Sequence, residues 1–118
     1  MIIAIDFDGT IVEHQFPMIG NLLPMAKEVI NWIYDKGHDV IIWTCRSVAD
    51  TPEQYKDMVN FLNKNGIHYS KINENSDKST FKPFPKIFAH VYIDDRNFNG
   101  FPGWEVVKER MMWLELAS

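Results

Sequence analysis

The sequence of 118 residues lacks the marks of several protein classes. It has one cysteine, Cys45, which excludes an intrachain disulfide and any CxxC metal or redox motif. A chain without disulfides suits a reducing compartment, and we expect the cytoplasm. It also has no run of Lys and Arg, and 12 basic against 16 acidic residues give a net charge of −4. General nucleic-acid binding is therefore not expected.

Long apolar runs are also absent. No stretch is long enough to span a membrane, and the residues before Asp6 lack the basic region of a signal peptide. We therefore expect no membrane partner. With 46% hydrophobic residues, the chain is long enough to form a core without disulfides or a structural metal. A single domain over residues 1–118 is the expected organisation.

Short apolar runs rich in β-branched residues predict buried strands. They cover residues 2–7, 40–43 and 88–93, and a more mixed run over 67–72 predicts a further, weaker strand. Residues 73–86 are polar and predict a loop with one helical turn near its end.

Apolar residues at helical spacing alternate with these runs. They predict helices over residues 24–36, 52–65 and from 104 onward. Pro24 is expected to open the first helix, and Thr51 to Gln54 form a predicted capping box for the second. Strands alternating with helices indicate βαβ units. The predicted fold class is α/β, a Rossmann-like three-layer sandwich with a mostly parallel sheet.

Three predicted strands end in polar side chains, and the carboxyl ends of parallel strands meet at one edge of a sheet. These side chains are Asp6 and Asp8, Thr44 and Arg46, and Asp94 and Asp95. Four crowded carboxylates would repel one another, and a hard cation such as Mg²⁺ is the simplest compensation. A carboxylate beside Mg²⁺ is suited to attack phosphorus, and a second is suited to general acid–base catalysis.

Structural interpretations compete with these roles. The aspartates also suit turns and a helix cap, although an unpaired charge directly after a buried strand is costly. Arg46 suits either a surface pair with Asp50 or a fork for a substrate phosphate or carboxylate. The four histidines share no metal-ligand spacing and are interpreted as structural. Only His14 lies in a loop that is able to cover the crevice expected at the carboxyl ends of the strands.

The run DFDGT, from Asp6 to Thr10, resembles the first motif of the haloacid dehalogenase superfamily. Thr44 resembles the second motif, and Asp94 with Asp95 resembles the acidic pair of the fourth, so the resemblance spans residues 2 to about 96. The resemblance implies that Asp6 is the nucleophile, Asp8 the general acid and base, and Thr44 a donor to the phosphoryl oxygens. It implies Asp94 and the Asp8 carbonyl as metal ligands, and Asp95 as a ligand or its support.

The family's third motif is a lysine upstream of the acidic pair. Lys78, Lys82 and Lys86 are the candidates. Lys86 is preferred because it directly precedes the predicted strand 88–93, and Lys78 is the second choice. This lysine would offset carboxylate repulsion and hold the phosphoaspartate.

No segment is long enough for the cap domain that many relatives carry, so the chain resembles the capless phosphatases. The expected activity is Mg²⁺-dependent hydrolysis of a small phosphorylated substrate, with Thr44, Cys45 and Arg46 in substrate binding. The Cys45 thiol is interpreted as a core group because it alternates with Thr44. A phosphotransferase of the same family and a non-catalytic phosphate-binding module are the alternatives.

The loop after the acidic pair contains Phe98, Phe101 and Trp104 among turn residues. Aromatic residues clustered at a surface favour an interface, and a homo-oligomer that partly closes the open crevice is one expectation. The alternative is that Trp104 packs in the core and anchors the last helix.

Overall fold

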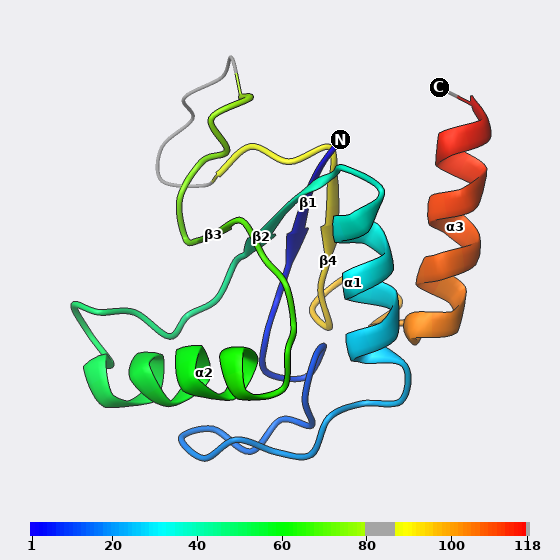
Figure 1. Cartoon of the computed structure of the whole chain (residues 1–118). Helices are drawn as coiled ribbons and strands as arrows, with labels where there is room; N and C mark the ends of the chain where they lie inside the picture. The colour runs from blue at the N-terminus through cyan, green and yellow to red at the C-terminus, as the bar shows by residue number, and fades with distance from the viewer. Residues whose placement is uncertain (80–86, 118) are drawn as a thin grey trace.

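The computed structural model describes residues 1–79 and 87–117 of the chain (Figure 1). In chain order its elements are β1 (Ile2–Ile5), α1 (Ala26–Asp35), β2 (Asp39–Ile42), α2 (Pro52–Lys64), β3 (Lys71–Ile72), β4 (Val91–Ile93) and α3 (Trp104–Ala117). The predicted alternation of strands and helices is confirmed.

The four strands form one parallel sheet in the order β3-β2-β1-β4. The central strand, β1, is buried along its whole length, as its continuous apolar run predicts. In the register of the sheet, Ile5 pairs with Ile42 of β2 and with Ile93 of β4. The residues that follow these three strands therefore emerge side by side at one edge. The chain is a Rossmann-like α/β sandwich.

The helices α1, α2 and α3 contribute to one core cluster on a single face of the sheet. Ile3 and Ile5 of β1 face this cluster, and α1 and α3 lie side by side over it (Figure 1). Side chains alternate along a strand, so Ile2 and Ala4 face the other side. There Ile87 and Ala89 cover them, and the layer described on that face is irregular chain.

The direction of the strand order explains this arrangement. The chain moves outward from β1 through β2 to β3 and then returns to place β4 on the other side of β1. Crossovers between parallel strands keep a right-handed sense. The described residues Ile87 and Ala89, which precede β4, accordingly lie on the opposite face from the helices.

Tertiary contacts shorten some predicted elements. The first helix begins at Ala26 and not at Pro24, because Met25 adopts a left-handed conformation with φ 66°. The last strand begins at Val91, because the preceding residues turn onto the face of the sheet. The weak strand is reduced to Lys71–Ile72 at the sheet's edge.

The predicted capping box at α2 is wrong, although the helix itself is confirmed. The Thr51 hydroxyl makes no cap bond to the helix. It accepts a hydrogen bond from the Ser47 N–H at 2.8 Å and donates to the Ser47 carbonyl at 3.3 Å. The side chain therefore closes the loop between β2 and α2.

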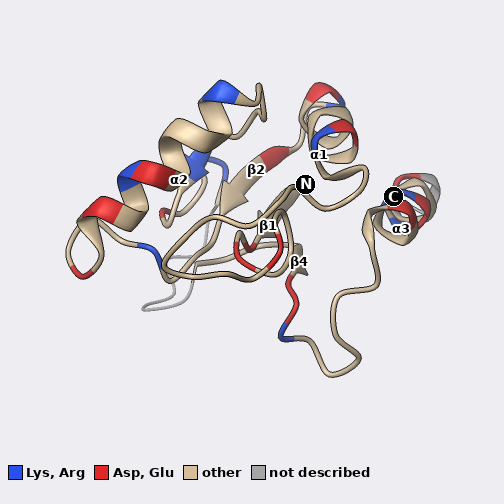
Figure 2. Cartoon of the chain, turned by 90° about the horizontal axis from the view of Figure 1, so that it is seen from below, with Lys and Arg blue, Asp and Glu red and all other residues tan. Residues whose placement is uncertain are grey.

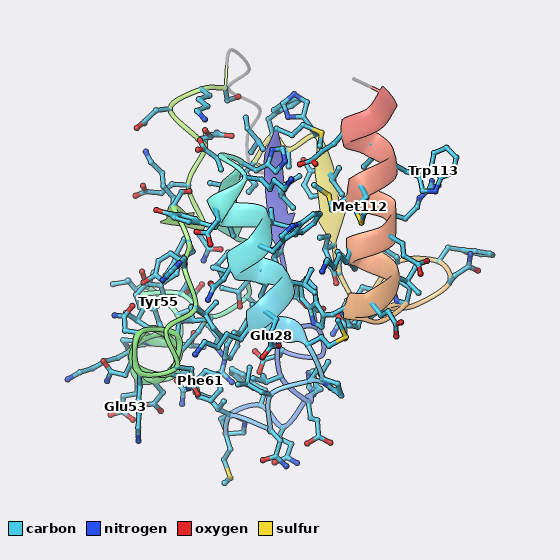
Figure 3. All side chains as sticks on the ribbon, turned by 45° about the vertical axis from the view of Figure 1, so that its right-hand side comes forward. Glu28, Glu53, Tyr55, Phe61, Met112 and Trp113 are labelled. Atoms are coloured by element: carbon cyan, nitrogen blue, oxygen red, sulfur yellow. The ribbon has the colours of Figure 1, made fainter. Side chains whose placement is uncertain are left out.

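The aromatic residues after β4 do not share one environment. Trp104 is 2% exposed and belongs to the core, whereas Phe98 is fully exposed. Trp104 is thus unavailable to an interface, and the expectation of a homo-oligomer rests on Phe98 and Phe101 alone. Figure 3 shows Trp113 directed away from the body of the molecule on α3. None of the helices in the described part of the chain has the length and apolar character needed to cross a membrane.

Candidate active site

Three carboxylates meet at the carboxyl edge of the sheet. Asp6 directly follows β1, and Asp94 and Asp95 directly follow its neighbour β4. The Asp6 N–H donates to the Ile93 carbonyl at 2.9 Å, which continues the strand pairing to the site. One oxygen from each of the three carboxylates lies within 4.8 Å of the others. Figure 2 shows acidic positions after β1 and β4, with a basic position following the latter.

Burial of the cluster changes the chemistry of Asp6. Burial, reinforced by the Asp95 hydrogen bond and the charges of Asp94 and Asp95, raises the pKa of Asp6 to about 8. Without a cation, the Asp6 carboxyl therefore holds a proton at neutral pH. A bound divalent cation reverses this preference because it neutralises the like charges.

Asp95 shows that the cluster fits a hard cation. Its Oδ1 is buried and has no hydrogen-bond partner among the described residues. An orphaned carboxylate oxygen is costly unless a ligand satisfies it. Oxygen ligands converging from Asp6, Asp94 and Asp95 are the donors that Mg²⁺ prefers.

Gly9 of the DFDGT run makes room for Asp95. Its φ is +84°, and a Cβ added there would lie 2.2 Å from the Asp95 Oδ2. Only glycine combines this backbone conformation with the required space. Gly9 therefore allows the turn after β1 to approach the acidic pair after β4 closely.

The fourth aspartate, Asp8, has a different partner. Its carboxylate accepts two hydrogen bonds from Arg46, Nε to Oδ2 and Nη2 to Oδ1, both at 2.8 Å. This turns the Asp8 side chain away from the metal-ligand cluster, which does not include it. The Asp8 carbonyl stays a predicted ligand.

Arg46 is fully buried, which corrects its expected surface pairing with Asp50. Its remaining donors reach the carbonyl oxygens of Pro17, Met18 and Gln54 at 3.5, 3.0 and 3.1 Å. A guanidinium has five N–H donors, and all five are used by the protein. Direct substrate binding by Arg46 is thus not supported. The side chain positions Asp8.

Thr44 is held at the edge by a residue that the sequence analysis missed, Asn73. The Asn73 Oδ1 accepts the Thr44 N–H at 2.9 Å, and its Nδ2 donates to the Arg46 carbonyl at 3.1 Å. Asn73 has φ 55°, a conformation that asparagine tolerates better than most residues. The signal was its place directly after a predicted strand. The Thr44 hydroxyl accepts a hydrogen bond from the backbone N–H of Arg46 at 3.1 Å and keeps its own proton to donate.

Trp104 supports the site from the last helix. Its indole N–H donates to the Thr10 carbonyl at 2.8 Å, in a fully buried bond. The Phe101 ring packs edge-on against the Trp104 ring, with 5.3 Å between the ring centroids. The first turn of α3 thus anchors the DFDGT turn, as the alternative interpretation of Trp104 anticipated.

A pocket of about 210 Å³ opens at this edge of the sheet. Its lining residues are Asp6, Asp8, His14, Phe16, Thr44, Cys45 and Arg96. Cys45 is exposed there, so its interpretation as a core thiol is wrong. The turn between Thr44 and buried Arg46 breaks the strand alternation on which that interpretation relied.

The candidate lysines do not enter the described site. Lys78 lies at the amino ends of the strands, opposite the candidate site. Its Nζ is 3.4 Å from the carboxylate of Asp39, the first residue of β2. Its Nζ also donates to the Gly37 carbonyl. This placement removes Lys78 as the second choice. Lys82 and the preferred Lys86 lie outside the described residues.

The histidines have the expected structural roles in two places. His38 joins the amino group of Met1 to Glu115, at 2.7 and 2.8 Å. His90 accepts the Ile2 N–H at 2.9 Å. His14 differs from them because it lines the pocket.

The fold and the site define the chain as a Rossmann-like α/β protein with a carboxylate-lined pocket at the carboxyl edge of its sheet. The solved structure of a conserved protein from Bacteroides thetaiotaomicron matches it with a TM-score of 0.84 and 32% sequence identity. The match covers 95% of this chain and 89% of that one. The chain belongs to the same family as that protein. No protein-family model and no curated protein matches it.

Proposed function

We propose that the chain is a capless phosphatase of the haloacid dehalogenase superfamily, a Mg²⁺-dependent phosphomonoester hydrolase. The observation that carries the proposal is the cluster of Asp6, Asp94 and Asp95, in which a buried Asp95 oxygen has no hydrogen-bond partner within residues 1–79 and 87–117. Asp8 lines the same pocket, two residues after Asp6. The spacing of DFDGT and the acidic pair supports this family over other phosphate-binding proteins.

In the first step, an Asp6 oxygen attacks the phosphorus of the substrate. The bond between phosphorus and the leaving oxygen breaks, and Asp8, which begins the cycle in its protonated form, gives that oxygen a proton. In the second step, Asp8 takes a proton from water, whose oxygen attacks the phosphorus. The bond from phosphorus to Asp6 breaks, inorganic phosphate leaves, and both aspartates return to their starting states.

The Asp8–Arg46 fork is compatible with proton transfer by Asp8. A carboxylate has about four lone-pair positions, and the two bonds from Arg46 use two of them. Two positions remain, and Asp8 lines the pocket. Arg46 thus fixes the direction in which Asp8 presents its oxygen.

Asp6, Asp94, Asp95 and the Asp8 carbonyl would hold the cation. When bound, Mg²⁺ supplies charge neutralisation for the phosphoryl oxygens and for the attacking carboxylate. The Thr44 hydroxyl would donate to a phosphoryl oxygen, and Lys86 is the proposed lysine of the site. The single cysteine supports work in a reducing compartment, which we propose is the cytoplasm.

The direct test is phosphate release from an aryl phosphate and a panel of small phosphomonoesters, with Mg²⁺ or with a chelator. Wild-type protein is expected to require Mg²⁺, and Asp6→Asn is expected to abolish turnover. Asp57→Asn is the matched control, because Asp57 is an exposed aspartate of α2. Undiminished turnover by Asp6→Asn contradicts the mechanism. Transfer of phosphate to an added alcohol would indicate the phosphotransferase.

A further inference from the structure

Arg96 is a basic residue at the candidate site to which the proposed mechanism gives no role. Its backbone N–H donates to the Asp94 Oδ1 at 2.9 Å, which holds residue 96 beside the carboxylate cluster. Its side chain is exposed and lines the pocket. The guanidinium makes no hydrogen bond or ion pair within the described residues.

Arg96 and Arg46 differ in whether their guanidinium donors are used within the protein. All five donors of Arg46 are occupied inside the protein, and Arg46 does not line the pocket. Among the described lining residues, Arg96 is the only permanent cation. The pocket therefore offers one guanidinium fork without a partner among the described residues, in a lining that also contains the carboxyl groups of Asp6 and Asp8.

The transferred phosphoryl group has other partners in the proposed site. That group would bind at Asp6, where Thr44 and a cation held by the carboxylate cluster already neutralise its oxygens. Arg96 lies on the loop that continues from the cluster and shares the lining with His14 and Phe16, which are also exposed. These exposed residues are therefore available to the part of the substrate that departs.

The size of the pocket limits that part. Pockets for drug-sized ligands measure about 300–1,000 Å³, whereas this one has about 210 Å³. A leaving group of a few atoms fits this space. A guanidinium binds a carboxylate through two parallel hydrogen bonds, which combine charge with planar geometry.

We propose that the substrates are small phosphomonoesters of hydroxy acids, and that Arg96 binds the carboxylate of the leaving group. This inference rests on the proposed phosphatase function and adds the substrate class. Arg96 is a specificity residue that recognises the group displaced from phosphorus. The chemistry at Asp6 and Asp8 is the same for every phosphomonoester.

The test compares 3-phosphoglycerate with glycerol 3-phosphate, because the two differ in a carboxylate against a hydroxymethyl group. The ratio of their kcat/KM values is measured for wild type, Arg96→Gln, Arg96→Lys and Arg110→Gln. Wild type is expected to favour the acid by about tenfold or more, a ratio typical of one charge-assisted pair. Arg96→Gln is expected to lose this preference through a higher KM for the acid.

The other variants check the cause. Arg96→Lys keeps the charge without the fork and is expected to recover part of the preference. Arg110→Gln removes an exposed arginine of α3 that does not line the pocket, and its ratio is expected to equal that of wild type. If Arg96→Gln lowers kcat equally for both substrates, Arg96 acts on the phosphoryl group and the inference is wrong. No preference in wild type also overturns it.

A binding measurement keeps this inference separate from the catalytic proposal. Calorimetry with Asp6→Asn and Mg²⁺ is expected to show tighter binding of 3-phosphoglycerate than of glycerol 3-phosphate. The difference should disappear when Arg96→Gln is added. If this pattern appears and wild type hydrolyses neither compound, hydrolysis of these esters fails while the recognition by Arg96 stands. If both compounds bind equally tightly, with and without the Arg96→Gln substitution, Arg96 does not recognise the carboxylate.

Discussion

Arg46 shows how one buried side chain can shape a candidate site whose pocket it does not line. Its fork holds both oxygens of Asp8, and the Phe7 and Phe16 rings lie 5.3 and 5.0 Å from its guanidinium carbon. A buried ion pair is costly to break, because the remaining charge is left without its partner. The position of Asp8 therefore depends on this arginine.

Substitution of Arg46 is expected to damage stability and activity together. Arg46→Gln should lower the free energy of unfolding by about 3 kcal/mol, because Asp8 would lose its buried partner. Denaturant unfolding measures this change, and phosphate release should fall with it. Arg110→Gln is the control for simple removal of charge. An unfolding free energy equal to that of wild type would show that the fork contributes nothing.

Gly9 permits a test of the fit between the DFDGT turn and Asp95. Gly9→Ala places a Cβ against the Asp95 carboxylate and should weaken Mg²⁺ binding by about tenfold or more, because one of few ligands is displaced. Gly37→Ala is the matched control. Gly37 also has a positive φ, +91°, but nothing lies within 4 Å of its added Cβ.

Calorimetric titration with Mg²⁺ separates the two glycines. Both variants should lose about 1 kcal/mol or more of stability from the positive φ. Only Gly9→Ala should lose affinity for the cation. Equal affinities in the two variants would remove Asp95 from the metal site.

At the scale of elements, α3 supports the turn after β1 although the two are far apart in sequence. The bond from the Trp104 indole to the Thr10 carbonyl connects residues separated by 94 positions. Its loss would leave a buried carbonyl oxygen without a donor. The last helix thus contributes to the order of the first motif.

Trp104→Phe is expected to remove this support with little change in shape. The free energy of unfolding should fall by about 1–3 kcal/mol, the cost of an unsatisfied buried group together with a small cavity. Trp113→Phe on the same helix is the control, because Trp113 is 70% exposed and its substitution should change stability by less than about 0.5 kcal/mol. Thermal or denaturant unfolding distinguishes the two. Equal effects would mean that the buried indole bond is unimportant.

At the scale of the whole molecule, the raised pKa of Asp6 makes stability depend on pH. In metal-free protein this pKa rises from 3.8 to about 8, so the folded state binds more protons than the unfolded state between these values. The contribution of Asp6 to stability is therefore complete below pH 3.8 and is lost as the pH rises toward 8. A bound cation should oppose this loss, because it favours the ionised carboxylate.

The difference in unfolding free energy between wild type and Asp6→Asn isolates this effect. With a chelator present, wild type should lose stability relative to Asp6→Asn as the pH rises from about 4 to about 8. Mg²⁺ at pH 8 should restore wild type and leave Asp6→Asn nearly unchanged. A difference that does not vary with pH would place Asp6 in a solvated, unperturbed environment.

The sequence by itself determined the order and type of the elements, because apolar runs and helical spacing are local signals. It also determined that Asp6, Thr44 and Asp94 share one edge, since each follows a strand of a parallel sheet. The element ends were less certain. Met25 and Ala89 depart from the expected helix and strand because tertiary packing overrides local preference at these positions.

Only the tertiary structure decided how the side chains at that edge pair with one another. Asp8 lies two residues from Asp6, yet its partner is Arg46, 38 positions away, and not the carboxylate cluster. Arg46 and Arg96 each stand two residues after a motif residue, but one is buried with every donor used and the other is exposed at the pocket. Sequence patterns report which residues follow a strand. Partner choice depends on burial and on long-range contacts, which exist only once the chain has folded.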